Sequence, residues 1–201
     1  MACPRDSPEY TRFSNNPGRV HWEAAKRVLR YLKGTKKRRL NLGGKSPGIA
    51  AFTDADWRSN RDDRRSIGAY IVKIGDGAVS WKSKKQSCVA LSSTEAEYMA
   101  LCQASKEAVW MVDFLKNLGV SLRGPMVVNV DNQGSIALAK NPGFHDRSKH
   151  IDIQYHFTCD LVKEQKIHLE YITTKDMLAD LLTKSLPRAQ HEQRSEGIGL
   201  F

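Results

Sequence analysis

The sequence predicts an α/β fold in which a mixed five-stranded sheet is flanked by helices, with a separate basic helix at the N-terminus. Two observations lead to this prediction. The main part of the chain, from residue 47, begins with three strand-like runs. Beyond residue 91 the chain alternates between helical patterns and short apolar runs. Strands joined by hairpins pair antiparallel, whereas strands joined through helices pair parallel, so this order gives a mixed sheet.

The first part of the chain contains one helical pattern and three strand patterns. A helix is expected over residues 21–33, where Trp22, Leu29 and other apolar side chains recur on one stripe. The turn-forming residues of 43–48 then indicate a linker or a tight turn. The Gly-Asp-Gly sequence at 75–77 predicts a hairpin between the second and third strands. The three strands are expected over residues 49–56, 66–74 and 78–86.

The second part begins with a long helix, expected over residues 92–119. Ser92 and Glu95 form the S-x-x-E pattern of a capping box at its start, and Gly119 ends it. The apolar run at 126–130 is typical of a strand that is covered on both faces. Two helices, a strand and a last amphipathic helix follow, expected over residues 135–140, 149–164, 168–173 and 175–186.

The basic character of the chain is concentrated near the N-terminus. The formal net charge is +10; residues 1–46 contain 12 Lys and Arg against 3 Asp and Glu, and the remainder contains 20 against 19. A polyanionic partner for this segment is one interpretation, and a solvated basic helix without a partner is the other. We divide the chain into a disordered or upstream remnant (1–17), a basic helix and linker (18–46), the main domain (47–186) and a polar, frayed tail (187–201).

The cysteine pattern and the hydropathy indicate an intracellular protein without a membrane partner. The four cysteines form no C-x-x-C pair, and no apolar run is long enough to cross a bilayer. The first ten residues also lack the apolar segment of a secretory signal. We therefore expect reduced, structural thiols.

Four acidic residues lie at positions that this fold would bring together. Asp54 lies near the end of the first sheet strand, Glu97 lies one turn into the long helix, Asp131 follows the apolar strand, and Asp180 lies in the last helix. The carboxyl ends of parallel strands form the usual site of open α/β sheets. Mg²⁺ prefers carboxylate oxygens, and two such ions held together can hydrolyse a phosphodiester. The pattern therefore predicts a two-metal nuclease site.

Longer stretches make this prediction more specific. Four stretches are DADWRSNRDDRRS, WKSKKQSCVALSSTEAEYMAL, VDNQGSIALAKNPGFHDRSKHIDIQYHF and LADLLTK, and in these the chain resembles the ribonuclease H domain of copia-type LTR retrotransposon Pol polyproteins. A fifth stretch, NNPGRVHWEAAKRVLRYLKGT, resembles the connection segment that follows reverse transcriptase in the same polyproteins. The resemblance extends from about residue 10 to residue 186, and long motifs in the right order are far more specific than a lone short motif.

The resemblance implies a ribonuclease H-like fold for residues 47–186 and endonucleolytic hydrolysis of the RNA strand of RNA–DNA hybrids during reverse transcription. It assigns catalysis, and the binding of two Mg²⁺ ions or of Mn²⁺ in their place, to Asp54, Glu97, Asp131 and Asp180. The implied partners are the hybrid and the reverse transcriptase domain of the same polyprotein. The implied location is a cytoplasmic virus-like particle or the nucleus. A catalytically inactive remnant that only binds nucleic acid is the alternative function.

Competing assignments exist for three of the four acids. Glu95 is the expected capping partner of Ser92, which leaves Glu97 for metal binding. The competitors are Asp56 for the place of Asp54, a helix-capping role for Asp131, and Asp176 for the place of Asp180.

Contacts to nucleic acid are predicted at three places. The start of the long helix offers backbone N–H groups to a phosphate. The two residues after Asp131 are placed to reach base edges or ribose 2′-hydroxyls in a shallow minor groove. Lysines on the third strand form a basic edge, for which protection of an edge strand is the alternative explanation. These three groups are Ser93 and Thr94, Asn132 and Gln133, and Lys82, Lys84 and Lys85.

The histidines give weaker signals. Many ribonucleases H carry a histidine on a glycine-rich loop before the last helix, but here only Thr173 and Thr174 separate the predicted strand and helix. His145 and His150 have an H-x₄-H spacing, but no cysteine pair completes a zinc site. A loop or helix-surface position is the interpretation for these histidines, and a proton relay through His150 is the alternative.

Overall fold

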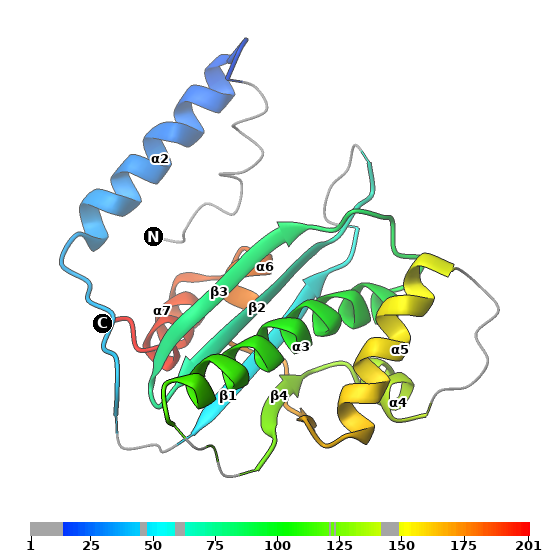
Figure 1. The fold of residues 1–201 in the computed structure, drawn as a ribbon. Helices are drawn as coiled ribbons and strands as arrows, with labels where there is room; N and C mark the ends of the chain where they lie inside the picture. Colours follow the sequence, from blue (N-terminus) through cyan, green and yellow to red (C-terminus); the bar gives the residue numbers. More distant parts are fainter. Residues whose placement is uncertain (1–13, 45–47, 59–62, 121, 123, 142–148) are drawn as a thin grey trace.

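A computed structural model gives the fold of the chain. It describes residues 14–44, 48–58, 63–120, 122, 124–141 and 149–201, without the side chains of 149–153. Figure 1 shows a twisted sheet with the long helix α3 on one face and the short helices α6 and α7 on the other. The two helix layers cover a sheet whose central strands are buried.

The sheet has the predicted mixed architecture. Its strand order is β3-β2-β1-β4-β5. β1 pairs antiparallel with β2, and β2 with β3, as the predicted hairpin requires. β1 pairs parallel with β4, and β4 with β5, because helices connect these strands. The strands are β1 (Ile49–Asp56), β2 (Ile67–Ile74), β3 (Gly77–Lys85), β4 (Met126–Val130) and β5 (Ile167–Tyr171).

Most helices also lie where the periodicity predicted them. They are α2 (Arg19–Thr35), α3 (Ser93–Asn117), α4 (Gln133–Lys140), α5 (Lys149–Lys163), α6 (Asp180–Thr183) and α7 (Arg188–Gly197). Ser92 caps α3 by accepting a hydrogen bond from the Glu95 backbone N–H at 3.1 Å. Glu95 in turn accepts a hydrogen bond from the backbone N–H of Leu91 rather than that of Ser92. The start of α3 is therefore fixed by the two residues expected to fix it.

The helix α3 packs closely on the sheet through small residues and on helix α5 through one aromatic pair. A Cβ atom added to Gly68 of β2 would lie 3.3 Å from the Ala100 side chain, so the helix and the sheet approach closely here. On its other side, the Tyr98 hydroxyl donates to the Tyr155 carbonyl at 3.0 Å, and the two rings stack. Because Glu97 lies beside Tyr98, this packing also sets the position of the predicted metal ligand on α3.

The expected last helix over residues 175–186 is wrong. The segment after β5 passes through turns, and only Asp180–Thr183 is helical. The side chain of Arg194 explains the break, since it donates to the carbonyls of Thr174 and Met177 at 2.9 Å. In a continuous helix those carbonyls would accept from residues four positions later.

The expectation of a polar, frayed tail over residues 187–201 is also wrong. Helix α7 occupies most of it, and the polar residues His191, Arg194 and Ser195 are buried. These side chains make hydrogen bonds inside the protein; for example, the Ser195 hydroxyl donates to the His191 carbonyl at 2.7 Å. A buried face made of polar residues has no apolar periodicity, and this helix could therefore not be recognised from hydropathy.

The N-terminal segment joins the main domain near its C-terminal end. Helix α2 stands away from the sheet (Figure 1), and its Tyr31 ring contacts the His191 ring edge-on at 5.9 Å. The backbones of Arg39 and Phe201 exchange two hydrogen bonds. A Cβ on Gly77 would lie 2.4 Å from the Asn41 carbonyl oxygen, so only glycine fits this crossing. The segment between α2 and β1 is therefore hydrogen-bonded to the domain over residues 39–43. Within the described part of the chain, no helix is long and apolar enough to cross a membrane.

Candidate metal centre and nucleic-acid contacts

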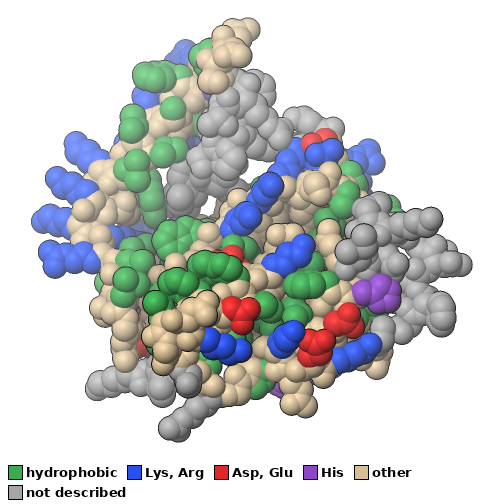
Figure 2. Space-filling model, in the orientation of Figure 1, with side chains coloured by type: hydrophobic (Ala, Val, Ile, Leu, Met, Phe, Trp, Pro, Cys, Tyr) green, Lys and Arg blue, Asp and Glu red, His purple; other side chains and the backbone are tan. Residues whose placement is uncertain are grey.

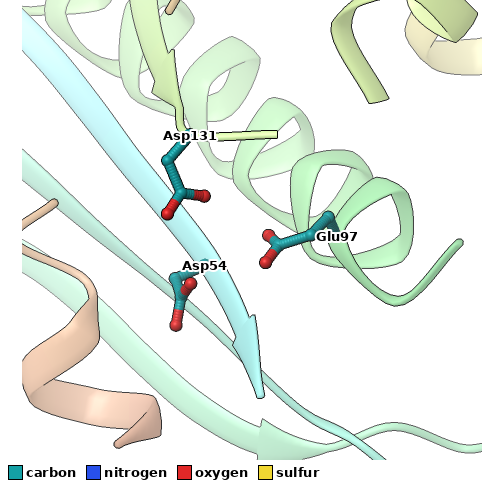
Figure 3. A group of neighbouring side chains, drawn as sticks. All are labelled: Asp54, Glu97 and Asp131. Carbon is teal, nitrogen blue, oxygen red and sulfur yellow. The ribbon is translucent and has the colours of Figure 1, made fainter. Parts of the chain in front are cut away.

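Three of the four predicted acids converge. Asp54, Glu97 and Asp131 each place one carboxylate oxygen so that all three atoms lie within 4.8 Å of one another, and Figure 3 shows the three side chains close together, from β1, α3 and the end of β4. The parallel register pairs Thr53 of β1 with Val130, the last residue of β4. The residue that follows each of them in the sequence is an acid, Asp54 or Asp131. Glu97 reaches them from the second turn of α3. The sheet topology therefore builds this cluster from segments that are distant in the sequence.

The cluster is electrostatically unfavourable without a cation. Burial, followed by the nearby Asp54 and Asp131 carboxylates, raises the pKa of Glu97 to about 9. Burial and then Asp54 raise the pKa of Asp131 above its ordinary value. The Oε2 atom of Glu97 is buried and accepts no hydrogen bond from any residue that the structure describes. An unpaired buried carboxylate oxygen facing two other acids fits a divalent cation.

The fourth predicted acid, Asp180, lies beside this cluster and is joined to it by a lysine. The Lys184 ammonium donates to Asp180 Oδ1 at 2.7 Å and to Asp54 Oδ1 at 2.9 Å. Thr183 donates to Asp54 Oδ2. Burial raises the pKa of Asp180, and its ion pair with Lys184 acts in the opposite direction. Asp180 is 2% exposed, so its charge depends on these partners.

A second cation, Arg194 of α7, reaches the same place from the C-terminal helix. Its guanidinium donates to Asp180 Oδ2 at 2.9 Å and to the Thr174 carbonyl. The Thr174 hydroxyl donates to Asp131 Oδ2 at 2.9 Å. Arg194 therefore bonds directly to one predicted acid and to the residue that holds another.

Sequence reasoning missed both cations. Lys184 lies four residues after Asp180, a spacing that could have indicated an ion pair on a helix. Arg194 had no comparable signal, because its partners lie 14 to 20 residues earlier in the chain.

The structure also separates the predicted acids from their competitors. Asp54 belongs to the acidic group of three and Asp56 does not. The helix-capping role weighed for Asp131 falls to Asn132, whose side chain accepts from the Ser135 backbone N–H at 3.0 Å. Asp176 is exposed, and its carboxylate accepts from the Thr173 hydroxyl at 2.7 Å. Asp180, which is buried next to Asp54, is therefore the better placed of the two acids on its segment.

The predicted nucleic-acid contacts form two groups. A Cβ on Gly134 would lie 3.1 Å from the Thr94 side chain, so the N-termini of α3 and α4 lie side by side. Four predicted contact residues belong to these two helix starts: Ser93, Thr94, Asn132 and Gln133. The side chain of Asn132 is partly committed to capping α4.

The lysines of β3 differ in their surroundings. Lys82 and Lys84 line a shallow hollow with Gln103 of α3. Lys85 also reaches this hollow, but its ammonium binds Asp63 at 2.5 Å. The structure thus gives Lys82 and Lys84 a surface position near α3 and gives Lys85 a structural partner. The residue His145 and the side chain of His150, considered above for zinc and proton relay, lie outside the described residues.

Comparisons with known proteins relate the chain to retrotransposon polyproteins. No family model matches the chain. It is 43% identical over its full length to the "Retrovirus-related Pol polyprotein from transposon TNT 1-94" of Nicotiana tabacum, of which it covers 15%. It is 41% identical over 95% of its length to the corresponding polyprotein from transposon RE2 of Arabidopsis thaliana, of which it covers 13%. The chain thus spans about one seventh of the length of these curated relatives.

Solved structures of low sequence identity were also found. The N-terminal RNase H domain of rv2228c from Mycobacterium tuberculosis aligns with 75% of this chain and 98% of its own, at 14% identity and a TM-score of 0.47. LC11-RNase H1, isolated from compost, aligns with 69% of this chain and 94% of its own, at 15% identity and a TM-score of 0.49. By its sequence relatives, the chain belongs to the retrotransposon Pol polyproteins, of which it spans a segment.

Proposed function

We propose that the chain hydrolyses the RNA strand of RNA–DNA hybrids in a reaction that depends on divalent cations, during reverse transcription of a retrotransposon. The observation that carries the proposal is the convergence of Asp54, Glu97 and Asp131 within 4.8 Å, next to Asp180. The sequence relatives, which are retrotransposon Pol polyproteins, supply the biological setting.

The donor set fits Mg²⁺ or Mn²⁺. Every candidate ligand is a carboxylate oxygen, the donor that hard cations prefer, and Glu97 Oε2 is buried without a hydrogen-bond partner among the described residues. One ion would be held by Asp54, Glu97 and Asp131. A second ion would be held by Asp54 and Asp180, whose carboxylates both accept hydrogen bonds from the Lys184 ammonium in this structure. Such ions, when bound, activate a water and stabilise the departing 3′ oxygen.

The residues around the acids would position the hybrid. Backbone N–H groups at the starts of α3 and α4 can donate to phosphate oxygens, because helix N-termini carry unpaired donors. The amide nitrogen of Asn132 and the side chain of Gln133 are donors that directly follow Asp131, and they could reach ribose 2′-hydroxyls. Contacts to 2′-hydroxyls would select the RNA strand. Lys82 and Lys84 would add sequence-independent attraction to the backbone.

A cleavage assay on three matched substrates tests the proposal. The full chain is incubated with Mg²⁺ and an end-labelled RNA–DNA hybrid, duplex DNA or duplex RNA of one sequence. We expect the RNA of the hybrid to be cut, the other two duplexes to remain intact, and EDTA to stop the reaction. Cleavage of all three substrates would contradict the substrate assignment, and binding of the hybrid without cleavage would favour the alternative of an inactive, nucleic-acid-binding remnant.

Asp131→Asn provides the matched inactive variant. Asp131 is half-buried and receives one side-chain hydrogen bond, from Thr174, so an amide should fit its place without disturbing the fold. Loss of a residue that merely orients a metal ligand costs about 10- to 100-fold, so loss of a ligand should reduce cleavage by about 100-fold or more. Thermal unfolding of the variant checks the fold. Undiminished cleavage by Asp131→Asn would contradict the metal-ligand role.

A further inference from the structure

The Lys184 ammonium occupies the space between two of the four acids. Its Nζ atom lies 2.9 Å from Asp54 Oδ1 and 2.7 Å from Asp180 Oδ1, and it therefore bridges a strand of the sheet and helix α6. The two carboxylates are 0% and 2% exposed, whereas the lysine side chain is 32% exposed. A positive group that bridges two buried carboxylates has the placement of a bound metal ion.

The other carboxylate oxygens at this place also have donors from the chain. Thr183 donates to the second oxygen of Asp54, and Arg194 donates to the second oxygen of Asp180. All four oxygens of these two acids are thus hydrogen-bonded within the protein. Glu97 differs, because its buried Oε2 has no hydrogen-bond partner among the described residues. Among the described residues, Glu97 Oε2 therefore has no donor, whereas Asp54 and Asp180 already share the Lys184 ammonium.

The chain holds Lys184 in this position from both sides. Its backbone N–H donates to the Asp180 carbonyl at 2.9 Å, which ends α6 and aims the side chain back toward Asp180. The two carboxylates hold the ammonium from the other end of the side chain. A lysine is positively charged at neutral pH, and this one has an exposed side from which it can leave.

We propose that the Lys184 ammonium is a built-in cation that fills the position between Asp54 and Asp180, and that a divalent cation binds there only by displacing it. This inference rests on the proposed function, because it concerns the second of the two cation positions. The position among Asp54, Glu97 and Asp131 would fill first, since the buried Glu97 Oε2 has no hydrogen-bond partner among the described residues and Lys184 contacts this position only through Asp54. Occupation of the second position would then be weak in the free protein, because the incoming ion competes with an intramolecular ammonium.

Counting bound Mn²⁺ tests the inference without any cleavage reaction. Free Mn²⁺ is measured by electron paramagnetic resonance during a titration of the full chain without nucleic acid. We expect one tighter ion and a second that binds at least about tenfold more weakly. Lys184→Met removes the competitor and should raise the affinity of the second ion by about tenfold or more. A folded Lys184→Met chain with an unchanged or weaker second ion would overturn the inference.

Two further variants separate charge from shape. Lys184→Arg keeps a cation in the position and should keep the second ion weak. Lys175→Met removes the same charge from a nearby exposed lysine and should leave both affinities at the values of the parent chain. Equal strengthening of the second ion in Lys175→Met would show that general charge, rather than the bridging position, controls affinity, and would overturn the inference.

A measurement on the unaltered chain decides the question if Lys184→Met does not fold. Lysines are acylated briefly at increasing Mn²⁺ concentrations, and the modification of each lysine is followed by mass spectrometry. Labelling of Lys184 should rise several-fold over the concentration range in which the second ion binds, while labelling of Lys175 stays constant. Constant labelling of Lys184 at saturation would overturn the inference. The absence of both Mn²⁺ binding and hybrid cleavage would instead contradict the proposed function itself.

Discussion

Glu97 is the residue whose protonation should control the stability of the metal-free protein. Its pKa rises to about 9 in the folded chain because of burial and the nearby Asp54 and Asp131, against 4.5 ordinarily. Between these two values the folded state binds more protons than the unfolded state, and stability therefore falls as pH rises through this window. Asp131, whose pKa is also raised, contributes in the same direction.

Urea unfolding in EDTA, repeated from pH 5 to pH 9, measures this effect. We expect the unfolding free energy of the parent chain to fall across the range, and Glu97→Gln, which cannot ionise, to lose most of the decline. Glu164→Gln, at an exposed position outside the cluster, should decline as the parent does. A parent-like decline in Glu97→Gln would show that the acidic cluster does not control the pH dependence.

At the scale of elements, helix α7 acts as a clamp on the site. Its Arg194 is 5% exposed and bonds Asp180 together with the carbonyls of Thr174 and Met177. These three bonds fix the start of α6, which carries Asp180, and the segment between β5 and α6, which carries the threonine that donates to Asp131. The C-terminal helix thus organises ligands that belong to two other elements.

Arg194→Met tests the clamp. Breaking a buried ion pair leaves a charge without a partner and typically costs about 3 to 5 kcal/mol. Because Lys184 still pairs with Asp180, we expect the lower end of this range: the unfolding free energy, measured in urea, should fall by about 3 kcal/mol. The variant should also need more Mg²⁺ for half-maximal cleavage. Arg188→Met, an exposed position on the same helix, should behave as the parent does. Unchanged stability and Mg²⁺ dependence in Arg194→Met would contradict the clamp.

The same helix shows where sequence patterns stop being informative. The strands and α3 were predictable because apolar residues such as Leu101 and Val128 repeat with the period of their element and are fully buried. Helix α7 instead buries the polar residues His191, Arg194 and Ser195. In the sequence, such a run of polar residues has the same pattern as a solvated tail. Three of the acids could be placed from the strand order, but the choice between Asp176 and Asp180 depended on contacts with Asp54 and Arg194 that sequence spacing does not encode.

At the scale of the whole molecule, the basic N-terminal segment is bonded to the end of the chain. Leu40 and Leu200 form an isolated antiparallel β-bridge, and the Asn41 backbone N–H donates to the Gly199 carbonyl at 2.8 Å. The segment also exposes apolar side chains, Trp22 and Leu29 among them, at 61% each. Figure 2 shows Lys and Arg side chains along the outer side of α2. The basic side chains of α2 are therefore exposed, and the segment that follows α2 is hydrogen-bonded to the residues after α7. Helix α7 in turn contacts the acids through Arg194.

The charge of α2 should contribute affinity for nucleic acid without choosing the site of cleavage. Lys and Arg contacts to phosphates release counterions, so the logarithm of the affinity falls with the logarithm of salt by roughly 0.9 for each contact in a duplex. We expect a fourfold Gln variant of α2 to bind the hybrid more weakly and with a flatter salt dependence, while the pattern of cleavage products persists. Arg38 and Arg39 are left intact because the Arg39 backbone bonds to the C-terminus. The substituted residues are Lys26, Arg27, Arg30 and Lys33, all exposed.

A matched variant separates this effect from the loss of net charge. It carries four Lys→Gln substitutions at exposed positions of the main domain and has the same net charge as the α2 variant. Fluorescence anisotropy with a labelled hybrid, from about 50 to 200 mM salt, gives the slope for each protein. If the α2 variant keeps the affinity and slope of the parent, or if the control loses as much, α2 is a solvated face and its charge has no specific role in binding. The control positions are Lys116, Lys140, Lys163 and Lys166.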